Sequence, residues 1–402
     1  MDKIKKQIIK TKSLNQQAIE LYNQSAIIVN LYYTEYVEEF FDYLKDIPDE
    51  IDIYIKSSLD KIIDMFKDFE QNKLCNRTFI YIKKENRGRD ISALLVDGQN
   101  IWRKYEYICF IHDKKAKRKQ DESVTALWRI NFLENMIGNN EYIDAVLNMF
   151  KVDTKLGLMI PPYPYDKNWN RSYMGNNYDN MVKLARKIGM LNNIEYDKNK
   201  ISIGTAFWCR TKSLKKLWEV EWKYEDFDDE PLPVDGTISH AIERILPYVA
   251  DDAGYKTVIA VNQNYIDMYC NELERDVHNF FDEMSYQFPV HSFDDIKKLM
   301  CNLQEISKYF KIHRNVYFYG AGFYGKKLYE FVKSFGLQPS GFIVTKKEKD
   351  ICEINGIKVL ELNELDKNQV DGIVITVGNK FSKDIEQNLQ NKDINDYLMI
   401  NI

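Results

Sequence analysis

The sequence lacks several features that define common protein classes. It has no apolar run near the roughly 20 residues that a membrane-spanning helix needs. Its 56 Lys and Arg against 61 Asp and Glu give a net charge of −5, which lacks the basic excess of a general nucleic-acid binder. No apolar segment follows the basic stretch Met1–Lys12, so we expect no signal peptide. We therefore expect a cytoplasmic protein in which Lys3–Lys12 can contact anionic lipid weakly.

Cysteine and histidine are sparse. None of the six cysteines forms a CxxC pair, and some lie inside apolar runs such as Tyr107–Ile111. This pattern indicates reduced core thiols and argues against a disulfide framework or a zinc site. Tyrosine is abundant, with 27 residues against 5 histidines. Tyrosines pack in cores and also line sugar sites, and composition alone does not separate these two roles.

What is present is an alternation of strand and helix patterns. With 402 residues, the chain is long enough for two or three domains. The helical pattern Glu35–Leu44 stands between the first two predicted strands. Such alternation predicts an α/β fold with a parallel sheet covered by helices. The first predicted strands are Ala26–Leu31, Ile51–Ile55, Thr78–Ile82 and Tyr107–Ile111.

The rest of the chain predicts further parts. The middle section is less regular and contains predicted strands at Leu156–Ile160 and Ile203–Trp208, with the aromatic loop Pro161–Trp169 between them. Residues 262–313 have helical patterns, and the alternation restarts in 314–402. We therefore predict a first domain over 1–261, a helical linker region over 262–313 and a small Rossmann-like domain over 314–402.

The first candidate site is the loop that follows the third predicted strand. It contains Asn86, Arg87, Gly88, Arg89 and Asp90. Loops at strand ends bind ligands in open α/β sheets, and paired arginine donors suit a diphosphate. The aspartate can accept a hydrogen bond from a ribose or a base. The alternative is a solvated turn in which the glycine supplies a positive φ angle.

The second candidate site follows the strand that ends at Ile111. His112 and Asp113 can ligate a metal, and Lys114 and Lys115 can neutralise phosphates. The alternative is a basic surface loop. No DxD triplet follows a strand here, and Asp226–Asp228, which has that spacing, is not preceded by a strand.

The third candidate site includes a predicted helix start. Asp235 precedes a turn, Thr237 can cap the helix, and His240 and Arg244 share a face. A carboxylate beside an imidazole suits a general base that deprotonates a hydroxyl group. The alternative is simple helix capping, with His240 and Glu243 as ordinary polar residues.

A glycine-rich turn opens the C-terminal part. Gly320, Gly322 and Gly325 follow a strand and precede a helix, which is the context of a nucleotide-binding turn. An NAD site needs an acidic residue at the end of the next strand, where this chain has Thr345 followed by lysines. We therefore do not expect NAD, and the glycines can serve only the tight turn and helix packing.

Several of these motifs, in this order, resemble the rhamnan synthesis protein F family over roughly residues 26–260. The resemblance rests on AIIVNLYYTEYVEEFFDYL, ENRGRDISALL, YEYICFIHDKK, GTAFWCR and VDGTISHAIER. It implies a nucleotide-diphospho-sugar transferase domain of the GT-A type, associated with rhamnose-containing cell-wall polymers and O-antigens. It also implies an enzyme that moves rhamnose or another hexose from a nucleotide-diphosphate sugar to a polysaccharide or lipid-linked glycan.

The same resemblance implies a role for each motif. The nucleotide sugar would be bound by Tyr33, Thr34, Asn86, Arg87, Gly88, Arg89, Asp90, His112, Lys114, Lys115, Gly204 and Thr205. Asp235 and His240 would face the acceptor. Our own prediction is that Asp235 is the base, and that Asp113 is a candidate ligand for Mn²⁺ or Mg²⁺. The alternative function is a non-catalytic scaffold of an assembly complex. A homo-oligomer is left open.

Overall fold

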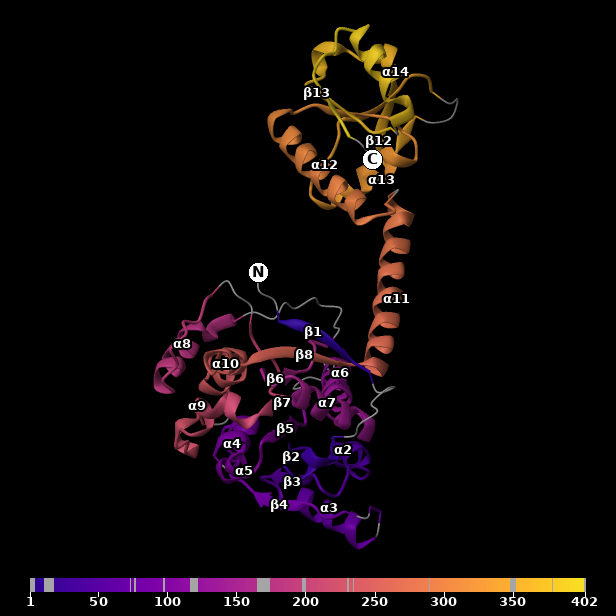
Figure 1. Ribbon diagram of the computed structural model, residues 1–402. Helices are drawn as coiled ribbons and strands as arrows, with labels where there is room; N and C mark the ends of the chain where they lie inside the picture. The colour runs from indigo at the N-terminus through magenta and orange to yellow at the C-terminus, as the bar shows by residue number, and fades with distance from the viewer. Residues whose placement is uncertain are drawn as a thin grey trace. The chain divides into compact units, whose positions relative to one another are not determined.

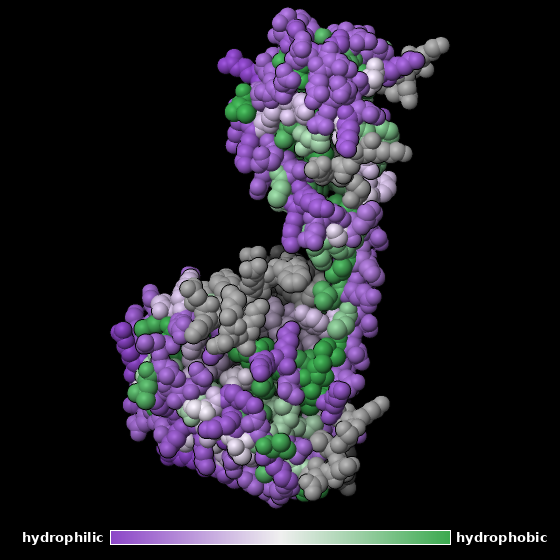
Figure 2. Space-filling view, turned by 45° about the horizontal axis from the view of Figure 1, so that its top comes forward, coloured by the Kyte–Doolittle hydropathy of each residue, from purple (hydrophilic) through white to green (hydrophobic). Residues whose placement is uncertain are grey.

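The computed structural model divides the chain into two compact units, Met1–Asn271 and Glu272–Ile402, which we describe separately (Figure 1). Among the described residues, no helix has the length and apolar character required to cross a bilayer. Polar side chains cover much of the visible surface in Figure 2, and apolar ones form separate patches. The structure describes residues 4–10, 18–72, 74–75, 77–96, 98–115, 122–164, 174–196, 200–229, 231–233, 235–288, 290–347, 352–377 and 379–400.

In its described part, the first unit contains an eight-stranded sheet with the order β1-β8-β6-β7-β5-β2-β3-β4. Every neighbouring pair is parallel except the two that involve β7, which runs antiparallel to β5 and β6. The strands are β1 (Lys5–Ile9), β2 (Ser25–Asn30), β3 (Asp52–Ser57), β4 (Ile80–Lys83), β5 (Tyr107–His112), β6 (Leu156–Ile160), β7 (Phe207–Arg210) and β8 (Lys256–Asn262).

Helices cover both faces of this sheet (Figure 1). Successive side chains of a strand point to opposite faces. Ile27 and Val29 of β2 therefore join one core, while Ala26 and Ile28 join the other. The first core packs against α2 (Val37–Leu44), α3 (Asp60–Gln71), α6 (Glu122–Phe132) and α7 (Asn140–Val152). The second packs against α4 (Arg89–Leu95), α5 (Gln99–Lys104), α8 (Tyr178–Lys187), α9 (Lys215–Trp218) and α10 (Ile238–Asp252).

The predicted parallel pairing of the sheet is interrupted at β7. The strand predicted from Ile203 begins only at Phe207, because Gly204 and Thr205 have φ angles of 96° and 40°. Such left-handed conformations cannot continue an extended strand. β1 was not predicted, since four of the five side chains in KKQII are exposed and the segment shows no apolar alternation.

In its described part, the second unit contains a smaller sheet with the order β11-β12-β10-β9-β13-β14, and helices cover it. Helices α12 (Phe293–Ile312) and α13 (Phe323–Ser334) pack against one face, and α14 (Asn379–Gln390) packs against the other. Helix α11 (Gln263–Gln287) spans the boundary of the two units. The predicted α/β fold with two separate sheets is thus confirmed. The strands are β9 (Val316–Tyr319), β10 (Gly341–Val344), β11 (Glu353–Ile354), β12 (Ile357–Glu361), β13 (Gly372–Ile375) and β14 (Tyr397–Met399).

Candidate functional site

The predicted site residues follow strands that end at one edge of the large sheet. In the parallel pair β2 and β5, Asn30 lies opposite His112, so both strands finish together. Tyr33 and Thr34 lie three and four residues after the end of β2 and are half-buried. Arg89 and Asp90 begin α4 after the adjacent strands β3 and β4. The carboxyl edge of a parallel sheet is where ligands of such folds bind.

Asp113 joins the ends of β5 and β2. Its Oδ2 atom accepts hydrogen bonds from the backbone N–H groups of Tyr32 and Tyr33, at 2.8 and 2.7 Å. The side chain is nearly covered, with 6% exposure. Burial raises the pKa of Asp113 to about 6, and the two N–H donors oppose that shift. The carboxyl group thus acts as a brace for the turn after β2.

His112 joins the same edge to the turn at Gly204. Its Nδ1 atom lies 2.6 Å from the carbonyl oxygen of Asp113, and Nε2 lies 2.9 Å from that of Gly204. Nε2 is also 3.8 Å from Oδ2 of Asp90. Both ring nitrogens are therefore engaged with backbone oxygens, which is not the arrangement of a histidine that ligates a metal.

The turn at Gly204 requires glycine. A Cβ atom there would lie 2.6 Å from Phe132 and 2.7 Å from Trp128, at a φ angle of 96° that side chains rarely adopt. The N–H group of Gly204 donates to Oε1 of Glu243 on α10 at 2.9 Å. Thr205 is buried at 1% exposure, and its hydroxyl oxygen has no partner among the described residues. This turn therefore connects α10 with β5.

Asp235, the predicted base, is held by three donors. Oδ1 accepts from Nδ2 of Asn177 at 2.6 Å and pairs with Arg244 at 3.1 Å, while Oδ2 accepts from the backbone N–H of Asn176 at 3.2 Å. Burial acts to raise the pKa of Asp235, but the Asn177 hydrogen bond and the Arg244 charge lower it overall. A carboxylate stabilised in this way is a weak proton acceptor.

His240 has a defined hydrogen-bonding direction. The N–H group of Thr237 lies 3.4 Å from Nδ1 and its hydroxyl oxygen 2.7 Å away, so Nδ1 acts as an acceptor. Burial lowers the pKa of His240, while Glu243 opposes the shift. A neutral ring with an accepting Nδ1 carries its proton on Nε2. This ring offers an N–H donor rather than a basic nitrogen.

The contacts described above join His112, Asp113, Gly204 and Glu243 into one cluster at this edge of the sheet. Two predicted cations belong to this cluster. Nζ of Lys114 lies 4.1 Å from the centre of the Trp128 ring. Burial lowers the pKa of Lys114, and the charges of Glu243 and Asp90 act to raise it. In the described chain no carboxylate lies within ion-pair distance of this ammonium group. The charge of Arg89, in turn, acts on both Tyr33 and His240.

Arg87 and Lys115 each pair with a carboxylate. Arg87 donates from Nε to the carbonyl oxygen of Phe227 at 2.9 Å and pairs with Asp229 at 3.1 Å. Lys115 is exposed and pairs with Glu35. Gly88, with a φ angle of 68°, packs against Phe227, and the preceding Asn86 is exposed. Arg87 therefore anchors the 227–229 loop, whereas the charges of Arg89 and Lys114 interact with residues of α10, namely His240 and Glu243.

The described residues do not fit a metal site at Asp113. Nowhere in that part of the chain do three His, Cys, Asp or Glu side chains approach closely enough to hold an ion. Oδ2 of Asp113 and both nitrogens of His112 already have protein partners. Metal dependence stays a prediction to be tested.

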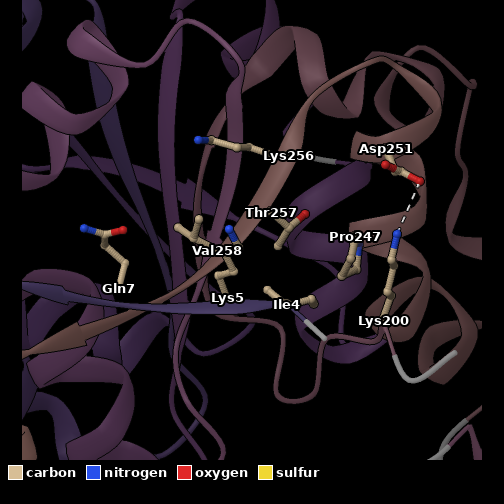
Figure 3. Close-up of a pocket in the computed structure, with 9 residues that line it drawn as sticks. All are labelled: Ile4, Lys5, Gln7, Lys200, Pro247, Asp251, Lys256, Thr257 and Val258. Carbon is tan, nitrogen blue, oxygen red and sulfur yellow. Dashed lines mark ion pairs between the residues drawn. The ribbon is translucent and has the colours of Figure 1, made fainter. Parts of the chain in front are cut away.

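Two cavities in the first unit lie apart from this cluster. One, of about 310 Å³, is shown in Figure 3, where Lys5, Lys256 and Thr257 come from the amino ends of β1 and β8. Lys200 and Asp251, which also line it, pair with each other at 3.8 Å. The other, of about 410 Å³, is lined by Asp42, Tyr43, Asp46 and 138–141. Neither is lined by a predicted site residue.

In the second unit, the glycine-rich turn packs tightly. A Cβ atom on Gly325 would lie 1.8 Å from the carbonyl oxygen of Gly320. The hydroxyl group of Thr376 donates to that same oxygen at 3.0 Å. Thr345, at the end of β10, lies 3.0 Å from the Tyr319 hydroxyl. Gly320 and Gly325 thus allow the helix to pack closely against the strand ends. At Gly322, by contrast, a Cβ atom would meet only open space.

A matched pair of alanine substitutions tests this packing. We expect Gly325→Ala to lower the free energy of unfolding of the second unit by about 3 kcal/mol, because the added methyl group displaces backbone. Gly322→Ala is the control, since nothing lies within 4 Å of its Cβ position. Urea unfolding of both variants measures the difference. Equal stabilities would contradict the packing role.

Glu243 is the site residue that sequence reasoning missed. It lies three residues after His240, so the two share a face of α10. That spacing was the available signal, but one acidic residue on a helix surface is common. Its contact with Gly204 spans 39 residues and appears only in the tertiary structure.

Comparison with known proteins agrees with this arrangement of motifs. Two relatives, both "Uncharacterized protein WxcX" from Xanthomonas campestris pv. campestris (strains B100 and ATCC 33913), are 26% identical over 245 residues. The match covers 60% of this chain but only 33% of each relative. Residues 312–400 match the family model "C2185-like, N-terminal". Residues 3–255, more than half of the chain, match the model for rhamnan synthesis protein F, and the chain therefore belongs to that family.

Proposed function

We propose that the first unit is a glycosyltransferase of polysaccharide synthesis, which moves rhamnose or another hexose from a nucleotide-diphosphate sugar to a cell-surface glycan or O-antigen. The family supports a role in rhamnan synthesis. One observation carries the enzymatic part: a chain of contacts runs from Asp113 through His112 and Gly204 to Glu243, and Lys114 lies beside it. Polar groups from separate segments converge at a ligand-binding edge.

The donor nucleotide would lie near Tyr33, Thr34 and the 86–90 loop, in a domain of the GT-A type. A sheet that is parallel except for β7 supports that proposal. The leaving diphosphate would be stabilised by Arg89 and Lys114. The burial of Lys114 supports this role, because fixed cations in a low-dielectric site interact strongly with developing negative charge.

The acceptor glycan would approach α10. Asp235 would then act as a positioning residue, because it holds Arg244 and Asn177 in place. The Nε2–H group of His240 would donate a hydrogen bond to a sugar or phosphate oxygen. A glycan acceptor of this kind is expected at the cytoplasmic membrane face, where the enzyme would be peripheral.

Thermal unfolding with a panel of nucleotide sugars tests the proposal. A ligand that binds only the native state, present at 100 times its Kd, adds about 2.7 kcal/mol to the free energy of unfolding. We expect one of UDP-, GDP- or dTDP-sugars to raise the midpoint, and parallel runs with and without Mn²⁺ measure metal dependence. NAD is the control ligand. No shift with any sugar nucleotide would contradict the proposal.

The internal pairing of Arg87 and Lys115 favours a second candidate, a non-catalytic scaffold of the assembly complex. On this hypothesis the polar edge is structural. The scaffold would give no thermal shift with the panel and no sugar transfer, whereas deletion of its gene would still abolish polymer assembly. A catalytically dead variant that fails to complement the deletion would contradict the scaffold.

A further inference from the structure

We infer that Glu243 is the general base of the proposed transfer reaction and takes the proton of the acceptor hydroxyl group. The inference rests on the proposed function and assigns it a catalytic residue. It follows from where Glu243 lies, which groups surround it and how few of its hydrogen-bonding positions are occupied.

Glu243 lies inside the cluster at the carboxyl edge of the sheet. It is half-buried on α10, and Oε1 accepts the Gly204 N–H at 2.9 Å. The carbonyl group of the same Gly204 accepts from the His112 ring. Among nearby charges, that of Glu243 acts most strongly on both Lys114 and His240. The carboxylate therefore faces the groups proposed to bind the diphosphate and the acceptor.

One oxygen of this carboxylate is available for a proton. Among the described residues, the N–H group of Gly204 is the hydrogen-bond donor to the Glu243 carboxylate, and it donates to Oε1. Oε2 then has lone pairs for a substrate hydroxyl group. The hydrogen bond also orients the carboxylate, as catalytic bases require.

Asp235 differs in this respect. Both of its oxygens are engaged, with Asn177 and Arg244 on Oδ1 and Asn176 on Oδ2. Protonation of Asp235 would weaken these contacts, so it is less suited to accept a proton during turnover. Compared with Asp235, Glu243 keeps an oxygen without a hydrogen-bond partner among the described residues.

The step is a single displacement at the anomeric carbon. The acceptor O–H bond breaks, and its proton moves to Oε2 of Glu243. The acceptor oxygen forms a new bond to the anomeric carbon, while the bond from that carbon to the diphosphate oxygen breaks. The electron pair of that bond leaves with the nucleoside diphosphate, next to Lys114 and Arg89. Release of the proton to solvent restores Glu243.

The test compares matched variants of the full chain with the nucleotide sugar that binds best. Glu243→Gln keeps an oxygen that can accept from Gly204 but removes the base. We expect its kcat to fall at least about a hundredfold, while the midpoint shift caused by the donor stays within error. Asp235→Asn should lose less than about tenfold. Glu219→Gln, on an exposed residue paired with Lys215, should be unchanged.

Chemical rescue separates catalysis from structure. In Glu243→Ala, added formate supplies a small carboxylate, and we expect it to restore turnover at least about tenfold. A purely structural role gives no such rescue. Near-wild-type kcat for Glu243→Gln would overturn the inference, as would a larger loss for Asp235→Asn. If the wild type neither binds nor transfers any sugar nucleotide, the proposed function itself has failed instead.

Discussion

Lys114→Met is expected to lower the kcat of sugar transfer by about a hundredfold to a thousandfold, which is the usual cost of removing one preorganised group that stabilises a developing negative charge. The ammonium group is half-buried over Trp128 and has no carboxylate within ion-pair distance in the described chain. Its charge is therefore available to the diphosphate of the proposed donor. Methionine keeps the contact with the ring and removes only the charge. Steady-state kinetics with the best donor measures the loss.

The neighbouring lysine is the natural comparison. Lys115 pairs with Glu35 on the surface, and solvent screens this pair. We expect Lys115→Met to lower kcat by less than about tenfold. Lys104→Met, on α5, serves as a control remote from the site. Equal losses at Lys114 and Lys115 would show that the structure assigns the wrong cation to the diphosphate.

The second large effect concerns Asp113. We expect Asp113→Ala to lower turnover about a hundredfold, because the N–H groups of Tyr32 and Tyr33 lose their acceptor and the turn proposed to bind the nucleotide moves. Asp113→Asn retains an amide oxygen that can accept both bonds. It should keep most of the activity. Kinetics and urea unfolding of both variants measure the two effects.

Comparison of Asp113→Ala with Asp113→Asn also distinguishes a structural hydrogen-bond acceptor from a metal ligand. An ion held by Asp113 would need the carboxylate charge, so Asn and Ala would then be equally damaging and Mn²⁺ affinity would fall in both. The Asn variant should also differ in how its free energy of unfolding depends on pH. The pKa of Asp113 is raised from 3.8 to about 6, so the native state retains a proton that the unfolded state releases in this range. The free energy of unfolding should fall as pH rises from 3.8 to 6, and Asp113→Asn should lose that part of the fall.

The site was only partly predictable. The motifs placed Asp113, His112 and Lys114 at a strand end, because a buried apolar run that stops at polar residues is a local pattern. The functions of these residues depend on partners far along the chain. His112 contacts Gly204 across 92 residues, and Asp113 contacts Tyr32 across 81. A motif gives the residue types but not which side chains remain available to a substrate.

Local sequence alone determined the alternation of strands and helices, the division into two α/β parts and the family, since each rests on periodicity or on short motifs and their order along the chain. Only the tertiary structure decided three further matters: the antiparallel β7, the ion pairs Arg87–Asp229 and Arg244–Asp235, and the free oxygen of Glu243. The physical reason is that hydrogen bonds and ion pairs between distant segments form only after the sheet has brought them together.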